Sequence, residues 1–251
     1  MIIAIWKCPD VPETKPNKYS RIFFEKKLNN QNMGSDLLHE LFNNPAQFVK
    51  NKYKGYNLLN EYLGGLDIET LRPALQSDNS DINNIAVSII SELNEASCAY
   101  LLPYLLTLID MPDSVYTQYL LTGIFKGTLK VNCKDFAPVI LQLNSQDYRR
   151  VISAMDLISR ANKCQLEHSF AHLQQTGQAP VLIKGLEMLL NIQCLHRDQI
   201  VQMISDRDPV LQYFGGIIAC KLQKTDPELL DSAYHSSNDI LSKFTAMSID
   251  V

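Results

Sequence analysis

A helical hairpin pattern that recurs about every 31 residues is the feature that most constrains the fold of this chain. In residues 67–94, apolar side chains occur at helical spacing on both sides of a polar segment at residues 77–81, which predicts two short helices joined by a turn. Each helix has a single apolar stripe and is too short to be stable alone in water. The hairpin therefore has to bury its stripes against neighbouring hairpins.

Proline and small residues mark the register of this repeat. Proline recurs in the predicted first helix, 30 and 35 residues apart, at Pro73, Pro103 and Pro138. A small residue recurs in the predicted second helix at intervals of 30 or 31 residues, at Gly123, Ala154, Gly185, Gly216 and Ala246. Polar turns with helix-capping residues separate the two helices, at residues 110–113, 144–147, 176–180, 206–209 and 236–239. The sequence thus predicts about six helical hairpins stacked in a right-handed row.

The chain before residue 67 departs from the repeat. Residues 1–19 contain three prolines, which disfavour helix, and are expected to form an irregular extended arm. Helices are predicted over residues 20–28, 35–42 and 45–63, the last with a break near Gly55. We therefore expect an N-terminal arm and helical cap over residues 1–66 and a repeat region over residues 67–251, in a single continuous domain.

Composition and charge limit the classes of partner. A net charge of −4 and a pI near 5.7 argue against a protein that grips phosphate backbones, so we expect protein partners and no nucleic acid. The apolar run over residues 1–6 is too short for a signal peptide, and no segment approaches the ~18 apolar residues of a membrane span. We expect a cytoplasmic protein with no membrane partner, whose six cysteines are reduced thiols.

The repeat itself carries a family resemblance. A unit of about 31 residues with two helices, proline in the first, an Asp-containing turn and a small residue in the second resembles the HEAT-like family of α-solenoids. The resemblance covers residues 67–250. It implies an all-α, right-handed superhelix in which each proline lies inside a first helix and bends it. It implies no particular activity, because solenoids carry their functions in surface side chains.

A narrower set of residues points to a function. It comprises Phe48, the run Tyr53-Lys54-Gly55-Tyr56-Asn57-Leu58-Leu59-Asn60-Glu61-Tyr62-Leu63-Gly64-Gly65, then Leu71-Arg72-Pro73, Leu75, Ser77-Asp78 and Ser91-Glu92-Leu93. This segment is similar to small bacterial immunity proteins encoded beside polymorphic or contact-dependent growth inhibition toxins. Such proteins bind and neutralise a cognate toxin, often a nuclease, in the cytoplasm. The similarity implies a toxin inhibitor that covers the active site or substrate cleft of the toxin and catalyses nothing itself.

Tyrosines and acidic residues in the first half of the chain are the candidate contacts with a partner. Tyrosine supplies large contact area at low entropic cost, and acidic groups suit a basic partner such as a ribonuclease. The alternative is a solvated face with tyrosines at the edge of the core. The candidate partner-binding residues are Tyr53, Tyr56, Glu61, Tyr62, Asp78, Asp81, Glu92, Tyr116 and Tyr119.

One group of residues has the spacing of metal ligands. Cys164, His168 and His172 fall on one face of a predicted helix, at i, i+4 and i+8. Cys164 also shares its repeat position with Cys98 and Cys133, where a small buried apolar residue is sufficient, and free cysteine behaves as a small hydrophobe. We therefore expect a structural cysteine, no metal and no cofactor.

An enzymatic role is not expected from the sequence. It contains no G-x-S-x-G, P-loop, G-x-G-x-x-G or H-E-x-x-H motif. Some HEAT-like proteins are DNA glycosylases with a basic concave surface, but here acidic residues outnumber basic ones by 27 to 23, and the only tryptophan, Trp6, lies outside the repeats. A general scaffold or adaptor is the main alternative to an immunity protein.

Overall fold

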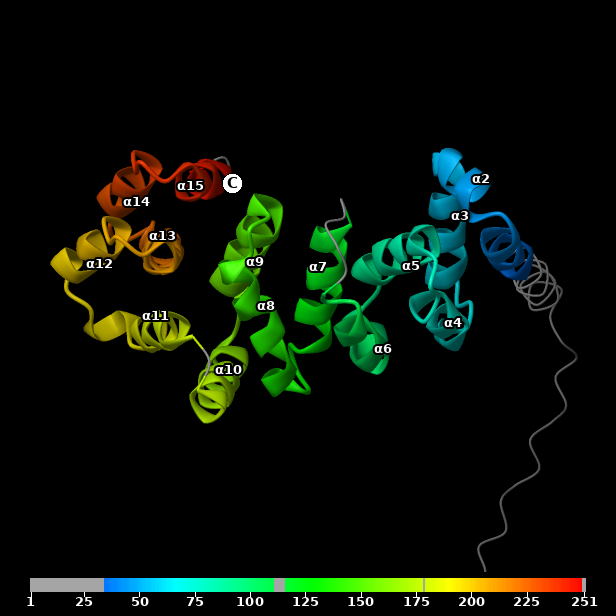
Figure 1. The fold of residues 1–251 in the computed structure, drawn as a ribbon, viewed down its shortest axis with the longest axis horizontal. Helices are drawn as coiled ribbons and strands as arrows, with labels where there is room; N and C mark the ends of the chain where they lie inside the picture. The colour runs from blue at the N-terminus through cyan, green and yellow to red at the C-terminus, as the bar shows by residue number, and fades with distance from the viewer. Residues whose placement is uncertain (1–33, 111–115, 178, 250–251) are drawn as a thin grey trace, which may run out of the picture.

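The computed structural model describes residues 34–110, 116–177 and 179–249, and these residues form helices joined by turns, with no strand among them (Figure 1). Residues 34–43 are helical, which confirms the helix predicted over residues 35–42. They are followed by α2 (Pro45–Lys50) and α3 (Lys52–Leu63). The predicted arm over residues 1–19 and the predicted helix over residues 20–28 lie outside the described residues.

The break in the predicted helix over residues 45–63 lies at Asn51 and not near Gly55. Asn51 has an extended backbone, and its side chain accepts a hydrogen bond from the amide of Tyr53, so that it ends α2 and caps α3. Gly55 lies within α3, where the nearest side-chain atom to an added Cβ is Ile85 Cδ1 at 3.6 Å. The capping side chain, not the glycine, therefore decides where the helix is interrupted.

Helical hairpins follow along the rest of the described chain, as the repeat predicts. Their elements, in chain order, are η1 (Ile68–Leu71), α4 (Arg72–Leu75) and α5 (Ser80–Glu92); α6 (Glu95–Thr107) and α7 (Thr117–Gly127); η2 (Cys133–Phe136), α8 (Ala137–Leu141), η3 (Gln142–Asn144) and α9 (Tyr148–Arg160); α10 (Lys163–Thr176) and α11 (Pro180–Leu190); η4 (Ile192–Cys194), α12 (Arg197–Ile204) and α13 (Pro209–Leu222); and α14 (Pro227–Tyr234) and α15 (Asp239–Ile249).

Asparagine and aspartate side chains fix where second helices begin. Asp147 and Asp208 each accept a hydrogen bond from a first-turn amide of α9 and α13, and Asn79 and Asn238 do the same for α5 and α15. All four lie in or beside the polar turns of the sequence pattern. The starts of these helices are therefore determined by local capping residues, which can be recognised in the sequence.

The prolines do not all bend a helix from within. Pro103 lies inside α6, as expected, but Pro73 and Pro138 lie in the first turn of α4 and α8. Each of these two short helices follows a 3₁₀ turn, η1 or η2. The first amides of an α-helix have no acceptor within the helix, so proline in the first turn leaves no hydrogen bond unmade, and a new α-helix can begin there after the 3₁₀ turn. The expectation of a continuous first helix is thus wrong in these two hairpins.

The small residues lie in the second helices, as predicted, and permit close helix contacts. A Cβ added at Gly216 would approach Leu241 Cδ1 of α15 to 2.2 Å and Met155 Cε of α9 to 3.7 Å. α13 is thus able to lie against both α9 and α15 at this point. At Gly216 the small residue therefore lies where helices of three different hairpins meet.

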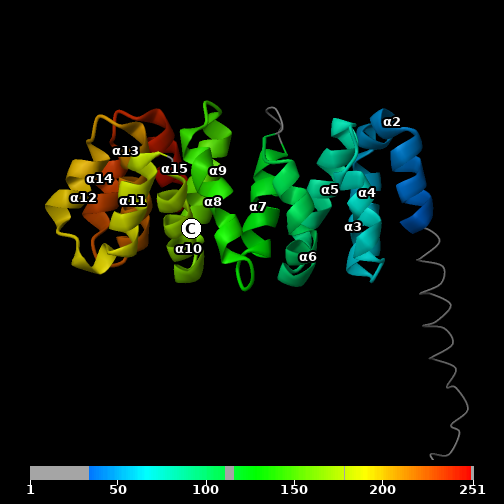
Figure 2. The same ribbon diagram turned by 60° about the horizontal axis from the view of Figure 1, so that its bottom comes forward.

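The hairpins are arranged side by side in chain order, and the row of hairpins bends sharply in its C-terminal half (Figures 1 and 2). α5, α7 and α9 contact one another in order, with α4 and α6 also in contact. Beyond α9 the hairpins do not continue as a straight row: α9 contacts both α13 and α15, so that the C-terminal end of the chain returns to the middle of the molecule. One continuous hydrophobic core extends through both parts, from Leu38 to Phe244.

Candidate functional site

A groove of about 360 Å³ lies where α2, α3 and α5 meet the beginning of α7. Its floor is apolar, because Phe48, Ile85 and Ile89 are buried. Aromatic side chains stand around it: Tyr56 is 63% exposed and Tyr119 is 39% exposed. The rings of Tyr116 and Tyr119 lie with their centroids 5.9 Å apart and tilted by 43°. We call this site the aromatic groove.

Helix packing sets the position of the tyrosines. Leu58 is fully buried and anchors α3 to the core, while Gly55 of α3 faces Ile85 of α5. Tyr53 and Tyr56 are three residues apart, so they project from the same side of α3. Tyr53 is 78% exposed and does not line the groove. The groove is thus built on packed helices, which keep its shape fixed before any partner binds.

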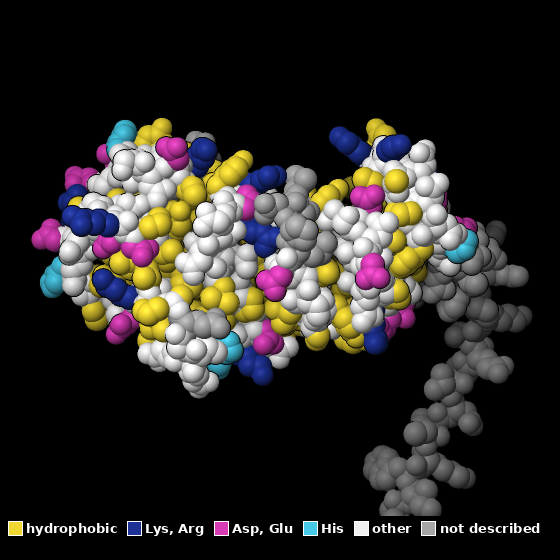
Figure 3. Space-filling view, in the orientation of Figure 1, with side chains coloured by type: hydrophobic (Ala, Val, Ile, Leu, Met, Phe, Trp, Pro, Cys, Tyr) yellow, Lys and Arg dark blue, Asp and Glu magenta, His cyan; other side chains and the backbone are white. Residues whose placement is uncertain are grey.

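The charges at the aromatic groove are balanced. Lys52 and Glu92 both line it, one from the start of α3 and one from the end of α5. Nearby, the ammonium group of Lys54 is paired with the carboxylate of Glu40. Figure 3 shows basic, acidic and hydrophobic side chains interspersed over the face that it draws. The sequence-based expectation of an acidic surface is therefore reduced, at this groove, to the single carboxylate of Glu92.

Two predicted contact residues are buried and do not belong to the surface. Glu61 is 7% exposed and Tyr62 is 6% exposed. The Tyr62 hydroxyl lies 2.8 Å from Thr70 Oγ1, whose own hydrogen is donated to the Asp67 carbonyl, so Tyr62 is the donor. Burial raises the pKa of Tyr62 to about 12. The prediction that Glu61 and Tyr62 contact a partner is wrong, because both share the inward face of α3 with Leu58.

The remaining predicted acids lie away from the aromatic groove. Asp78 is in the turn before α5 and Asp81 is in the first turn of α5, whereas Glu92 is its last residue. At 1.5 Å per residue, a helix of 13 residues separates its ends by about 18 Å. The structure thus brings together Tyr56, Glu92 and the pair Tyr116 and Tyr119, and leaves Asp78 and Asp81 outside the group.

No protein-family model matches this chain, and neither the curated proteins nor the solved structures include a match.

A second groove, of about 310 Å³, joins α7, α9 and α15 and was not anticipated from the sequence. Tyr148 is at its edge, 48% exposed, with the Arg149 guanidinium 5.8 Å and the Lys243 ammonium 5.2 Å from its ring centroid. Met247, which is 59% exposed, also lines this groove. The groove exists only because α15 packs against α9, and no local sequence pattern predicts that contact.

A larger groove, of about 780 Å³, lies between the end of α5, the start of α6 and the end of α7. Its charged groups are engaged: the Lys126 ammonium donates hydrogen bonds to the carbonyls of Ser91 and Leu93, and Lys130 pairs with Glu95 at 2.6 Å. Lys126 thereby satisfies carbonyls at the C-terminal end of α5. Because both lysines are engaged with other groups of the protein, we do not assign a ligand to this groove.

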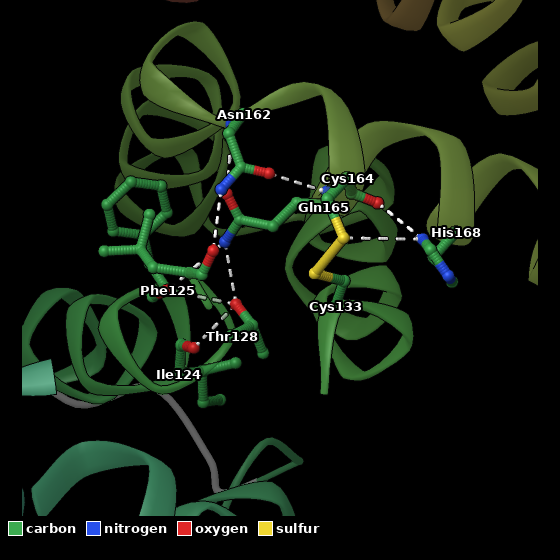
Figure 4. The surroundings of a disulfide bond; sticks show 9 residues. Ile124, Phe125, Thr128, Cys133, Asn162, Cys164, Gln165 and His168 are labelled. Atoms are coloured by element: carbon green, nitrogen blue, oxygen red, sulfur yellow. Dashed lines mark hydrogen bonds between the residues drawn. A yellow bond between two sulfur atoms is a disulfide. The ribbon is translucent and has the colours of Figure 1, made fainter. Parts of the chain in front are cut away.

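The metal-like spacing of Cys164, His168 and His172 does not produce a metal site. The sulfur of Cys164 is bonded to that of Cys133 in a disulfide (Figure 4). Among the residues that the structure describes, no group of three or more His, Cys, Asp and Glu side chains is arranged to hold a metal ion. The expectation that all cysteines are reduced is wrong for this pair.

Among all the residues that the structure describes, no helix has the length and apolarity needed to cross a membrane.

Proposed function

We propose that this protein is a binding protein of HEAT-like, right-handed α-solenoid architecture, and that the aromatic groove holds its protein partner. The observation that carries the proposal is the exposure of Tyr56 and Tyr119 on a rigid frame above a buried apolar floor. Large, partly exposed aromatic side chains that border a preformed groove are typical anchors of protein interfaces, because little conformational entropy is lost when they are covered.

The partner proposed for this groove is a bacterial toxin, and the protein is proposed to act as its immunity protein in the cytoplasm. The similarity to immunity proteins spans residues 48–93, and three walls of the aromatic groove, α2, α3 and α5, come from that same segment. An inhibitor needs no catalytic group of its own, only a surface that covers the active site or substrate cleft. The aromatic rings of the groove fit a protrusion that carries apolar side chains, and Glu92, which lines the groove together with Lys52, offers a contact to a basic side chain.

Replacing both Tyr56 and Tyr119 with alanine is expected to weaken partner binding by about 1,000-fold, because truncation of each aromatic anchor costs about 2 kcal/mol and the two together about 4 kcal/mol. The partner to be used is the protein encoded by the reading frame immediately upstream, co-expressed with this chain. Binding is measured by calorimetry, and protection is measured as growth of cells that express the toxin. Partner binding and protection should both be lost in the double variant.

The matched control for this experiment is Tyr234→Ala. Tyr234 ends α14, is 40% exposed, and lies far along the chain from the aromatic groove. We expect this variant to bind within about twofold of the unmodified protein. Undiminished protection by the double groove variant would contradict the site, and binding of the partner without any effect on toxicity would favour a general scaffold.

A charge reversal separates the groove from the rest of the acidic residues. Glu92→Lys is expected to weaken binding of a basic toxin by about tenfold, because it replaces the one carboxylate that lines the aromatic groove with a positive charge, which repels the basic groups of the toxin. Asp78 lies in the turn before the opposite end of α5, whose ends are about 18 Å apart, and Asp78→Lys is expected to change affinity by less than about twofold at physiological salt. The comparison is made by titration calorimetry at two salt concentrations. Equal effects of the two variants would indicate a broad acidic surface instead of a groove.

A further inference from the structure

The disulfide joins equivalent positions of two successive hairpins. Cys133 is in η2, at the start of one hairpin, and Cys164 is in the first turn of α10, at the start of the next, 31 residues later. Their Cα atoms are 6.0 Å apart, within the range that a disulfide requires. The two residues differ in exposure: Cys133 is buried, with 7% exposure, whereas Cys164 is exposed to solvent.

His168 lies beside the sulfur of Cys164, one helical turn after that residue (Figure 4). Its Nδ1 is 2.9 Å from the carbonyl oxygen of Cys164 and 3.7 Å from the Sγ of Cys164. A carbonyl oxygen only accepts hydrogen bonds, so Nδ1 carries the hydrogen that it donates. The same hydrogen is within reach of Sγ, where it is placed to stabilise a Cys164 thiolate when the disulfide is open.

The other described cysteines lack this combination of features. Cys98 is fully buried, its sulfur donates to the Ile90 carbonyl at 3.3 Å, and burial raises its pKa to about 11. Burial also raises the pKa of the Cys220 thiol. Cys194 is exposed and free, without a second cysteine bonded to it. An exposed cysteine residue, a hydrogen-bond donor beside its sulfur and a second cysteine in bonding position occur together at Cys164.

We propose that Cys133 and Cys164 form a thiol–disulfide exchange site that reacts with low-molecular-weight thiols and disulfides such as glutathione, with Cys164 as the attacking residue and Cys133 as the resolving residue. This inference stands independently of the proposed toxin binding. It assigns a function to a histidine and a cysteine whose spacing in the sequence resembled a metal site.

The reaction conserves atoms and electrons. In the reduced protein, the Cys164 thiol loses its proton and the thiolate attacks one sulfur of glutathione disulfide. The S–S bond of that molecule breaks, one glutathione leaves as a thiolate and takes up a proton, and a mixed disulfide remains on Cys164. The Cys133 thiol then loses its proton and attacks Cys164 Sγ, which releases the second glutathione. Two protein thiols are oxidised to a disulfide, and one glutathione disulfide is reduced to two thiols.

The first test locates the reactive sulfur in the full-length protein. The reduced Cys133→Ser variant is treated with glutathione disulfide under native conditions, and the adduct is located by mass spectrometry of peptides. We expect glutathione on Cys164 to form at least tenfold faster than on Cys98, which is the buried control. The same treatment of the reduced unmodified protein should end in the Cys133–Cys164 disulfide, which reduced glutathione reopens without denaturant. If the serine variant does not fold, this formation and reopening of the disulfide in the unmodified protein tests the proposal instead.

The second test addresses His168. His168→Leu is expected to slow adduct formation on Cys164 about tenfold at neutral pH, because the thiolate loses its hydrogen-bond donor. His168→Asn, which keeps an N–H near the position of Nδ1, should recover part of the rate, and His172→Leu on the same helix should leave it unchanged. Adducts that form first on Cys133, a disulfide that opens only after unfolding, or an unchanged rate in His168→Leu would overturn the proposal.

Discussion

Gly185→Ala is expected to lower the free energy of unfolding by about 2 kcal/mol, although alanine favours helix over glycine. A Cβ added at Gly185 would lie 2.0 Å from Cδ2 and 2.4 Å from Cε2 of Phe214. Phe214 is fully buried, so its ring has no free space into which to move. The helix preference contributes about 1 kcal/mol in the opposite direction, and overpacking of an aromatic ring exceeds it. Chemical denaturation followed by circular dichroism measures the change.

A second substitution tests whether Phe214 is the cause. In the background of Phe214→Leu, which removes most of the ring, Gly185→Ala should cost less than about 0.5 kcal/mol, a coupling that neighbouring residues show and distant ones do not. The matched control is Gly55→Ala in α3, where the nearest atom would be at 3.6 Å. That variant is expected to gain about 1 kcal/mol through helix preference alone. If Gly185→Ala were as stable as Gly55→Ala, the close contact of α11 with α13 would be wrong.

The hairpins were predictable because their determinants are local. The apolar stripe of α5, from Ile82 to Leu93, is buried as its spacing predicts, and Asn or Asp caps mark the helix starts. The curl of the C-terminal hairpins was not predictable, because it depends on contacts between residues remote in sequence. Gly216 meets both Met155 and Leu241 there, and a repeat register alone does not say whether a small residue faces the next hairpin or an earlier one.

The candidate site was predictable in part, for a geometric reason. Tyr56, Tyr116 and Tyr119 were identified as one group and do border one groove. Glu61 and Tyr62 were assigned to the same group although they stand three and four residues after Leu58, the spacing of a shared helix face. Since that face is the buried one, the helical spacing within α3 already held the information needed to exclude them.

The disulfide shows how a correct register can be interpreted too narrowly. Cys133 and Cys164 were assigned to the same repeat position, which places them in neighbouring helices. Axes of packed helices are typically 8–10 Å apart and Cα atoms lie about 2.3 Å from the axis, so facing positions of neighbouring helices can reach the Cα separation that a disulfide requires. The Cα atoms of Cys133 and Cys164 are 6.0 Å apart. The shared repeat position was therefore compatible with a disulfide as well as with two buried thiols.

Gln165→Met is expected to lower the free energy of unfolding by about 2 kcal/mol, because it removes buried hydrogen bonds that join α10 to α7 while keeping side-chain length. Gln165 is fully buried. Its Nε2 donates to Thr128 Oγ1 at 2.8 Å and to the Phe125 carbonyl at 3.2 Å, and its Oε1 accepts from the Asn162 amide at 3.1 Å (Figure 4). In the variant the Asn162 amide loses its acceptor, so native-state hydrogen exchange at this amide should accelerate as well.

The control for this variant uses the same motif in an exposed setting. Gln199 at the start of α12 accepts a hydrogen bond from the His196 amide at 2.8 Å, in the same capping arrangement as Gln165 with Asn162. Gln199 is exposed, so water replaces the lost contact, and Gln199→Met should cost about 0.5 kcal/mol or less. Equal losses in the two variants would mean that capping alone accounts for the role of Gln165. A loss several times greater at Gln165 would show that its hydrogen bonds hold α10 against the end of α7, across the intervening hairpin that the disulfide joins to α10.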